Sequence, residues 1–497
     1  MNLRRIISIG CLSVATLAMR APASAQIPSN GQIWKYVLLE GSYLTDDCPV
    51  CGRPTILQPM RGSFDLLALD NNPLFSRYEL RNISFSAGSK TTIEYRVTGG
   101  GIYRIGGEVA VLQDLTLQVS IDNGFTNKPC FFTNQLDSIG RPWPMIETSV
   151  DQTNGTLTQV YHLNLVAAPM REIWFSTVSG FTSANLPQPN NRGGRGDLLS
   201  SSGRIVKSNP LLLGRLGFMP MPGPVDLNID ALDVGPGGEI FFSLDTDMFS
   251  ETLGQIRNGD LVSNRGRIVH RNAELTQAFG LDVATGDVGL DAIVIKDDGE
   301  ILFSIAKDIF SPKLGTTLGH GDLLSAQGRI LKTNQQLLSR FHPMIESHDY
   351  GLDALYVWPS GEIWFSTEEG FQDQVLNMVT AGDLLSDQGA IVYRNLELLA
   401  AFAPLEDLAD FGLDALFVVT DATPSALAPT ISAISVERGT GNLSVQWNGP
   451  GRVFQMERAD EVVGPYSPAG PIVPDLTFMD AGVVTNHARS FYRLQQW

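Results

Sequence analysis

A unit of about sixty residues recurs four times along the middle of this 497-residue chain. A Gly-Asp-Leu segment and an Asp-Ala pair each recur at intervals of 61 to 63 residues. A third landmark in the same phase is the motif Glu-Ile-x-Phe-Ser, which begins at Glu172, Glu239, Glu300 and Glu362. A repeat of this kind predicts an architecture in which each unit covers the apolar face of the next.

Each unit carries sequence for four short strands and one short helix. In the fourth unit, residues 352–357 and 362–366 are β-prone runs separated by a turn that ends at Gly361. In the third unit, residues 322–325 and 329–331 flank a tighter turn. An asparagine follows the fourth strand, and we expect it to cap a short helix: Asn209, Asn272, Asn334 and Asn395.

Four-stranded antiparallel units repeated radially describe a β-propeller. The first unit lacks its own Asp-Ala strand, whereas residues 413–419 after the last unit supply a spare one. We predict that this spare strand pairs with residues 172–176 and closes a ring of four blades. The repeated pattern resembles hemopexin-like propellers over about residues 168–420, and the resemblance implies the fold alone. The whole chain also resembles a group of exported bacterial repeat proteins, which implies no mechanism.

The flanking regions are also β-rich, so the predicted fold class is all-β. Residues 27–165 show short alternating runs typical of a sandwich-like β domain, although residues 159–165 also suit an extra strand on the ring. Residues 421–429 are rich in proline, alanine, threonine and serine and are predicted to be a linker. Residues 430–497 resemble a fibronectin type III-like β-sandwich, although the segment is short for one.

The N-terminus has the pattern of a secretory signal peptide over residues 1–25. Arg4 and Arg5 precede an apolar run at 6–19 and an Ala-Ser-Ala cleavage site at 23–25. Lipid attachment at Cys11 is disfavoured because the apolar stretch before it is short. No later segment reaches the roughly 18 apolar residues needed to span a membrane. We therefore expect a secreted, periplasmic or cell-surface protein without a membrane span.

Composition narrows the classes of partner. The chain is 43% hydrophobic and 18% charged, which excludes a disordered chain. Its 53 acidic and 35 basic side chains give a formal net charge of −18, which disfavours nucleic acid and anionic membrane surfaces as partners.

The aspartates of the Asp-Ala pairs are the main candidate site residues. If their strands are innermost in each blade, as in hemopexin-like folds, four carboxylates converge near the ring axis. A cation such as Ca²⁺ would relieve their repulsion. The alternative, which the sequence favours, is that each accepts backbone hydrogen bonds within its own blade. The residues are Asp230, Asp291, Asp353 and Asp414.

The aspartates of the Gly-Asp-Leu segments are expected to stabilise turns rather than to bind a ligand. Each follows a loop of variable sequence, for example residues 245–259 and 306–321. Variable loops on one face of a rigid ring are where we expect a propeller to bind a ligand. These aspartates are Asp197, Asp260, Asp322 and Asp383.

Three cysteines remain after the signal peptide. The Cys48-x-x-Cys51 pair has the spacing of half a zinc ribbon or of a redox motif, but a second pair and a βαβ pattern are both missing. A structural disulfide between Cys48 and Cys51, or between one of them and Cys130, is the better interpretation.

Catalytic motifs are not recognisable. The sequence contains no G-x-S-x-G, no H-E-x-x-H and no phosphate-binding loop, and its six histidines show no metal-ligand spacing. We therefore expect a non-catalytic binding or structural protein whose loop face binds an extracellular glycan or protein. The alternative is an extracellular polysaccharide hydrolase or lyase that uses loop carboxylates as acid and base.

Overall fold

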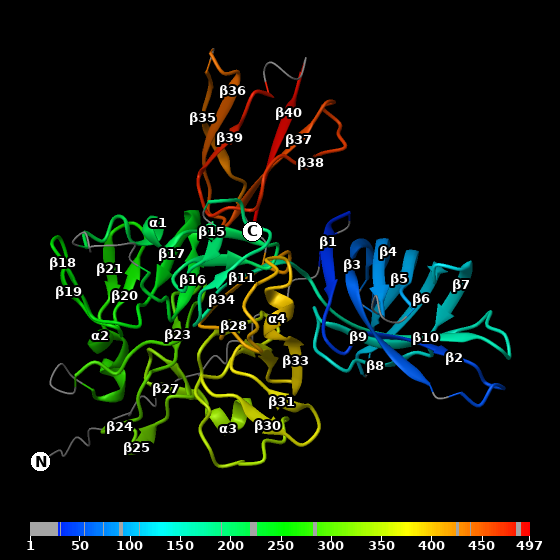
Figure 1. Ribbon diagram of the computed structural model, residues 1–497, viewed down its shortest axis with the longest axis horizontal. Helices are drawn as coiled ribbons and strands as arrows, with labels where there is room; N and C mark the ends of the chain where they lie inside the picture. Colours follow the sequence, from blue (N-terminus) through cyan, green and yellow to red (C-terminus); the bar gives the residue numbers. More distant parts are fainter. Residues whose placement is uncertain are drawn as a thin grey trace, which may run out of the picture.

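The chain forms three β-rich regions in a computed structural model (Figure 1). The N-terminal region is blue to cyan, the repeats run from green to yellow, and the C-terminal region is orange to red. The predicted signal peptide lies outside the described residues. The structure describes residues 28–29, 31–53, 55–72, 74–88, 93–108, 110–189, 191–218, 226–281, 286–423, 427–437, 439–483 and 489–497.

The N-terminal region is one ten-stranded sheet in which β9 pairs with β10, so that β10-β2-β3-β4-β5-β6-β7-β9 forms a closed circuit. The expected sandwich of two sheets is therefore wrong. Long strands such as β3 to β6 bend around a single interior, and the two ends of the sheet meet. The strands are β1 Ile33–Leu38, β2 Tyr43–Asp47, β3 Ile56–Asn71, β4 Phe75–Ala87, β5 Tyr95–Gly106, β6 Leu112–Asp122, β7 Asn127–Thr133, β8 Asp137–Ser138, β9 Ile146–Gln152 and β10 Val160–Ala168.

Alternating apolar side chains fill the interior of this sheet. On β10, Tyr161, Leu163 and Leu165 are each no more than 2% exposed, whereas Val160, His162 and Asn164, which alternate with them, are partly exposed. Residues 159–165 thus belong mainly to the N-terminal sheet and are not an extra strand of the repeats. The ring of Tyr36 stacks on Phe64 with centroids 5.2 Å apart.

The repeats form four antiparallel four-stranded sheets, as the unit pattern predicts. The hairpin and strand positions agree with the predicted runs. In sheet order the strands are β15 Arg204–Lys207, β14 Leu198–Ser200, β11 Met170–Ser176 and β34 Ala415–Thr420; β16 Leu232–Gly235, β17 Glu239–Phe242, β20 Leu261–Ser263 and β21 Arg267–His270; β22 Ile293–Ile295, β23 Ile301–Phe303, β26 Leu323–Ser325 and β27 Arg329–Lys332; and β28 Leu355–Val357, β29 Ile363–Phe365, β32 Leu384–Ser386 and β33 Ala390–Tyr393.

The first and last repeat segments meet in one sheet. Strand β34 follows the fourth unit but pairs with β11, with Ile173 opposite Val418 and Trp174 opposite Phe417. The predicted pairing of the spare strand with residues 172–176 is therefore present. Strands β16, β22 and β28 contact one another in chain order, and β34 contacts both β28 and β16. These four inner strands thus contact one another in a cycle.

A short helix follows the last strand of each unit, but the predicted cap is wrong. The asparagine is the first helical residue, and the residue before it occupies the N-cap position. The asparagine side chain is buried and binds the loop that leads into the next inner strand. Asn334 Nδ2 donates to the Gly351 carbonyl at 3.1 Å, and Asn334 Oδ1 accepts from Tyr350 N at 3.2 Å. The helices are α1 Asn209–Leu213, α2 Asn272–Thr276, α3 Asn334–Leu337 and α4 Asn395–Leu398.

The variable loops contain small two-stranded hairpins and are not irregular throughout. These strands are β12 Phe181–Thr182 and β13 Arg192–Gly193, β18 Met248–Ser250 and β19 Gly254–Ile256, β24 Ile309–Ser311 and β25 Thr316–Leu318, and β30 Phe371–Asp373 and β31 Asn377–Val379. The described residues of the repeats also include the 3₁₀ turns Pro236–Gly238 and Gln277–Phe279. Across the described residues, no helix combines the length and apolar character needed to cross a bilayer.

The C-terminal region consists of two three-stranded sheets packed through Val445, Trp447, Phe454 and Met456. It docks on the repeats: Trp497 Nε1 donates to Asp421 Oδ1 at 2.7 Å. Asp421 opens the predicted linker, yet it is only 6% exposed. The strands are β35 Thr430–Glu437, β36 Asn442–Asn448 and β39 Thr477–Asp480, with β38 Ser467–Pro468, β37 Phe454–Ala459 and β40 Phe491–Gln496.

Candidate functional site

The four Asp-Ala aspartates lie close enough to influence one another. Each stands one or two residues before one of the contacting inner strands, so the topology carries all four to the same end of those strands. Three of them are buried: Asp291, Asp353 and Asp414 are 7%, 9% and 2% exposed, and Asp230 is half-buried. The structure thus brings together the residues that the repeat singles out.

Burial raises the pKa of all four carboxyls, and like charge adds to the effect. The Asp414 carboxylate raises the pKa of Asp230 and of Asp353, and Asp230 raises the pKa of Asp291. For Asp414 itself, burial outweighs a hydrogen bond from Asn228 and raises the pKa to about 7. The cluster therefore holds protons near neutral pH unless a cation neutralises it.

Within the described residues, no backbone N–H donates to the carboxylates of Asp230, Asp291 or Asp353. The carboxylates therefore do not serve as backbone acceptors within their own units, which was the favoured structural interpretation. The nearby Glu368 carboxylate also raises the pKa of Asp291.

Asn228 is a further polar group in the cluster. Its Nδ2 donates to Asp414 Oδ2 at 2.5 Å. Its Oδ1 is buried and has no hydrogen-bond partner among the described residues, although Asn228 is only 6% exposed. The other units carry a glycine at this position, so the amide is specific to the second unit: Gly289, Gly351 and Gly412.

Two loop carboxylates extend the cluster toward the surface. The charge of Glu368 raises the pKa of Asp291 and of Asp353, and the charge of Asp245 raises the pKa of Asp230 and of Asp414. Arg195 lies 3.5 Å from Asp245 and partly offsets these charges. We refer to the group as the aspartate cluster: Asp230, Asp291, Asp353, Asp414, Asp245 and Glu368.

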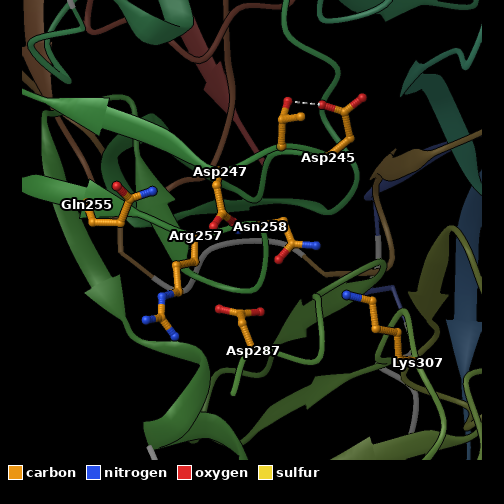
Figure 2. A pocket seen from close by; sticks show the side chains of 8 residues that line it. Asp245, Asp247, Gln255, Arg257, Asn258, Asp287 and Lys307 are labelled. Atoms are coloured by element: carbon orange, nitrogen blue, oxygen red, sulfur yellow. Dashed lines mark hydrogen bonds between the residues drawn. The ribbon is translucent and has the colours of Figure 1, made fainter.

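A pocket of about 660 Å³ opens beside the cluster, between the loops of the second and third units. Figure 2 shows Asp247, Arg257 and Asp287 on one side and Lys307 on the other. Burial raises the pKa of Asp287, and the nearby Asp260 and Asp247 charges raise it further. The remaining lining residues are Asp245, Thr246, Gln255 and Asn258. The pocket therefore offers both signs of charge and neutral amides, on the loops that the sequence indicated as a binding face.

A third row of repeated aspartates was missed by the sequence reasoning. Each stands four residues before an Asp-Ala aspartate and ties the preceding loop to the next unit: Asp226, Asp287, Asp349 and Asp410. For example, Gly382 N donates to Asp410 Oδ2 at 3.1 Å, and Gly412 N donates to Asp410 Oδ1 at 2.9 Å. Their spacing of 61 to 62 residues was the signal that could have found them.

The Gly-Asp-Leu aspartates stabilise turns in all four units, which is the role that their position suggested. Asp322 Oδ2 accepts from Gly319 N at 2.9 Å, and its Oδ1 accepts from Asn334 N at 3.2 Å. Asp197, Asp260 and Asp383 make the equivalent pairs of bonds. These carboxylates are thus occupied by backbone amides.

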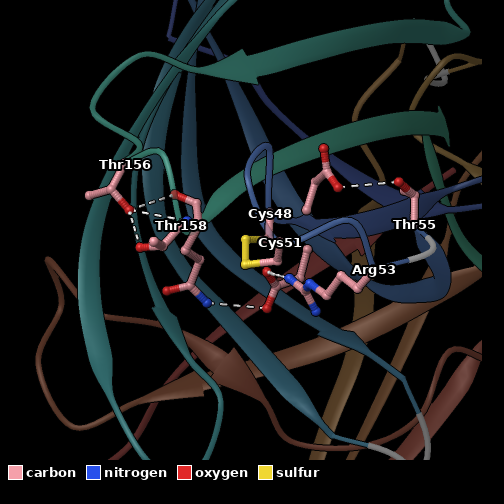
Figure 3. The surroundings of a disulfide bond; sticks show 9 residues. Cys48, Cys51, Arg53, Thr55, Thr156 and Thr158 are labelled. Atoms are coloured by element: carbon pink, nitrogen blue, oxygen red, sulfur yellow. Dashed lines mark hydrogen bonds and ion pairs between the residues drawn. A yellow bond between two sulfur atoms is a disulfide. The ribbon is translucent and has the colours of Figure 1, made fainter.

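The local disulfide joins Cys48 and Cys51, while Cys130 is a buried free thiol on β7. Figure 3 shows the disulfide beside Arg53, whose guanidinium donates to Asp46 at 2.7 Å. Burial raises the pKa of the Cys130 thiol. Both observations fit a structural role for the cysteines.

Comparison with known proteins identifies no family. No family model matches the chain, and no curated protein matches it. Among solved structures, the extracellular domain of a one-component system protein from B. thetaiotaomicron is 10% identical, with a TM-score of 0.12. That match covers 84% of this chain and 65% of the other, so the chain spans slightly less than two thirds of that structure's length.

Proposed function

We propose that this is an exported, non-catalytic binding or structural protein built on a closed four-bladed propeller, with a fibronectin type III-like tail. The cycle of contacts among β16, β22, β28 and β34 supports the ring. Its loop face binds an extracellular glycan or protein in the pocket at Asp247, Asp287 and Lys307. A ligand rich in hydroxyl and charged groups suits a lining of carboxylates, amides and two cations.

The aspartate cluster holds a Ca²⁺ ion in this proposal. The observation that carries it is the buried Asn228 Oδ1, which has no hydrogen-bond partner among the described residues and lies beside the Asp414 carboxylate. Leaving such an oxygen unsatisfied costs about 1 to 3 kcal/mol. Ca²⁺ binds six to eight oxygen ligands, and carboxylates and amide carbonyls are among those it prefers. The donor set therefore fits this ion.

Thermal melting with and without calcium tests whether the aspartate cluster binds Ca²⁺. Ca²⁺ at a hundred times its Kd stabilises the folded protein by about 2.7 kcal/mol and raises its Tm. Asp353→Asn removes one charged ligand, so the variant should lose most of that shift. Asp407→Asn is the matched control, because Asp407 is exposed and its side chain makes no hydrogen bond or ion pair within the described residues. Equal shifts in the wild type and Asp353→Asn would exclude the site.

A binding screen tests whether the pocket binds an extracellular glycan or protein. Glycans and extracellular proteins are presented to the exported form with Ca²⁺ or EDTA. Lys307→Ala should weaken any specific binder by roughly tenfold, because it removes one of two pocket cations. Lys313→Ala, an exposed lysine in the same loop, should leave binding unchanged. A ligand that binds both variants equally does not use this pocket.

One observation favours a polysaccharide hydrolase or lyase as a second candidate. The raised pKa of Asp287 beside Asp247 is the pairing expected of an acid and a base. Such an enzyme would release reducing ends or unsaturated sugars from a polysaccharide, and Asp287→Asn would abolish that release. Binding of a polysaccharide by the wild-type chain without any turnover favours the non-catalytic protein.

A further inference from the structure

Three potential metal ligands from separate parts of the sequence meet outside the aspartate cluster and the pocket. They are Asp308, His320 and Asp349, and one ligand atom from each lies within 4.8 Å of the others. His320 Nδ1 lies 2.8 Å from Asp308 Oδ1 and 3.9 Å from Asp349 Oδ2. The histidine is 24% exposed in its side chain, so solvent reaches the group.

Backbone amides hold the two carboxylates in place. His320 N donates to Asp308 Oδ1 at 2.9 Å, so the loop before β26 fixes this carboxylate beside the imidazole. Asp349 Oδ1 accepts from Gly351 N at 3.0 Å. Asp308 and His320 belong to the third unit, and Asp349 leads into the inner strand of the fourth. The group therefore bridges two units.

We propose that Asp308, His320 and Asp349 bind a divalent first-row transition-metal ion, with Zn²⁺ as the representative. Ligands at 2.0 to 2.1 Å around a tetrahedral ion lie about 3.3 Å apart, which the two distances bracket. The ion replaces the proton that Nδ1 shares with Asp308, and water occupies the remaining position. An imidazole donor suits Zn²⁺ and distinguishes this site from the all-oxygen aspartate cluster.

The other units provide an internal comparison. In the second unit the same positions carry Asp247, Asn258 and Asp287, and Asn258 N still donates to Asp247 Oδ1 at 3.0 Å. The backbone arrangement is thus shared, but an amide replaces the imidazole. The first and fourth units carry a glycine in place of the first aspartate, Gly180 and Gly370. Among the four units, the third alone has the complete donor set.

Sequence reasoning passed over this group because its members are 12 and 29 residues apart, unlike any short metal motif. Burial alone would lower the pKa of His320, but the Asp308, Asp349 and Glu368 carboxylates outweigh it and raise that pKa.

Isothermal titration of the full exported chain with Zn²⁺ tests the proposal. The protein is first treated with EDTA, dialysed and supplied with Ca²⁺, so that the aspartate cluster is occupied. We expect the wild-type chain to bind one Zn²⁺ and His320→Asn to bind it at least tenfold more weakly. Asn258→His should bind a second Zn²⁺, because it completes the same donor set in the second unit. His162→Asn is the matched control, because His162 faces the single carboxylate Asp151 at 2.7 Å.

Cobalt provides an independent readout. Co²⁺ bound through imidazole and two carboxylates should give visible absorption bands that His320→Asn loses and His162→Asn keeps. Circular dichroism of each metal-free variant verifies that it is folded. Absence of Zn²⁺ binding, or equal Zn²⁺ binding by folded His320→Asn, would overturn the proposal. Because Asp353→Asn should still bind Zn²⁺, failure here and failure of the calcium site are distinguishable.

Discussion

Arg141 of the N-terminal region donates to the Glu362 carboxylate in the fourth repeat unit, and both side chains are almost completely buried. Their exposed fractions are 4% and 0%. Ser386 Oγ also donates to Glu362, at 2.7 Å. An ion pair this well buried, between residues 221 positions apart, fixes the N-terminal region against the repeats.

The other three units neutralise the same glutamate with an arginine of their own. The pairs are Glu172–Arg204, Glu239–Arg267 and Glu300–Arg329. The equivalent position in the fourth unit is Ala390. Arg141 therefore supplies from another region the cation that the fourth unit lacks.

Replacing Arg141 with alanine should destabilise the protein strongly. The change leaves Glu362 as an uncompensated buried charge, and breaking a buried pair in this way costs about 3 to 5 kcal/mol. The free energy of unfolding is measured by urea denaturation. Arg96→Ala is the control, because its pair with Glu94 is exposed and 3.9 Å long, so the change should cost under about 1 kcal/mol.

Restoring the cation within the fourth unit should rescue the variant. Arg141→Ala combined with Ala390→Arg rebuilds the arrangement of the other three units, and we expect it to regain about half of the lost stability. If the double variant is no more stable than Arg141→Ala, the glutamate is not the group whose charge matters.

Arg452 holds the C-terminal region on the repeats. Its guanidinium lies 3.2 Å from Asp233 and donates to the carbonyls of Val234 and Ile295 at 3.0 and 3.1 Å. Arg452→Ala leaves Asp233, only 5% exposed, without its cation. We expect a separate, lower transition for the C-terminal region in calorimetry. Arg489→Ala, which breaks an exposed pair, should keep the wild-type profile.

The buried asparagines at the start of the short helices should contribute more to the stability of the protein than their helix position suggests. Asn334→Ala removes the partners of the Gly351 carbonyl and the Tyr350 amide, and each unsatisfied group costs about 1 to 3 kcal/mol. We expect a loss of at least about 2 kcal/mol in urea denaturation. Asn185→Ala loses one exposed hydrogen bond to Ala401 and should cost far less. Similar losses in both variants would contradict the proposed link between units.

The metal-free protein should become less stable as the pH rises through 7. The pKa of Asp414 is about 7 in the folded state but about 3.9 in the unfolded chain, so the folded state binds more protons between these values. The stability that protonated Asp414 contributes is complete below pH 4 and is lost as the pH rises through 7. Melting in EDTA at pH 6 and pH 8 measures the difference.

Asp414→Asn isolates this effect from that of histidines, which titrate in the same range. The amide cannot ionise, so we expect a smaller difference in Tm between pH 6 and pH 8 than in the wild type. Glu300 does not interfere: although burial opposes the shift, Lys296 lowers its pKa to about 2. An unchanged pH dependence in Asp414→Asn would show that this carboxyl is ionised throughout.

The local sequence pattern was sufficient to predict the structure of the repeats, because each unit contains its own hairpins. The period of the repeat predicted the strand positions, the pairing of the spare strand β34 with β11, and the position of the four aspartates before the inner strands. The same local reasoning failed to predict the sheet arrangement of the N-terminal region. Apolar and polar residues alternate along a strand in the same way in a two-sheet sandwich and in one closed sheet. It also failed for Asn334, because its partners lie 16 and 17 residues away.

The sequence by itself determined the all-β class, the four units and the rows of repeated aspartates, because strand periodicity and turn residues act between near neighbours. Only the tertiary structure decided which charges face one another. Arg141 meets Glu362 because the N-terminal region packs against the fourth unit, and Asp349 meets Asp308 and His320 because the loop before the inner strand of the fourth unit lies beside the third unit. Burial there removes the water that would screen them, so the pairing of buried charges depends on three-dimensional packing that no local pattern encodes.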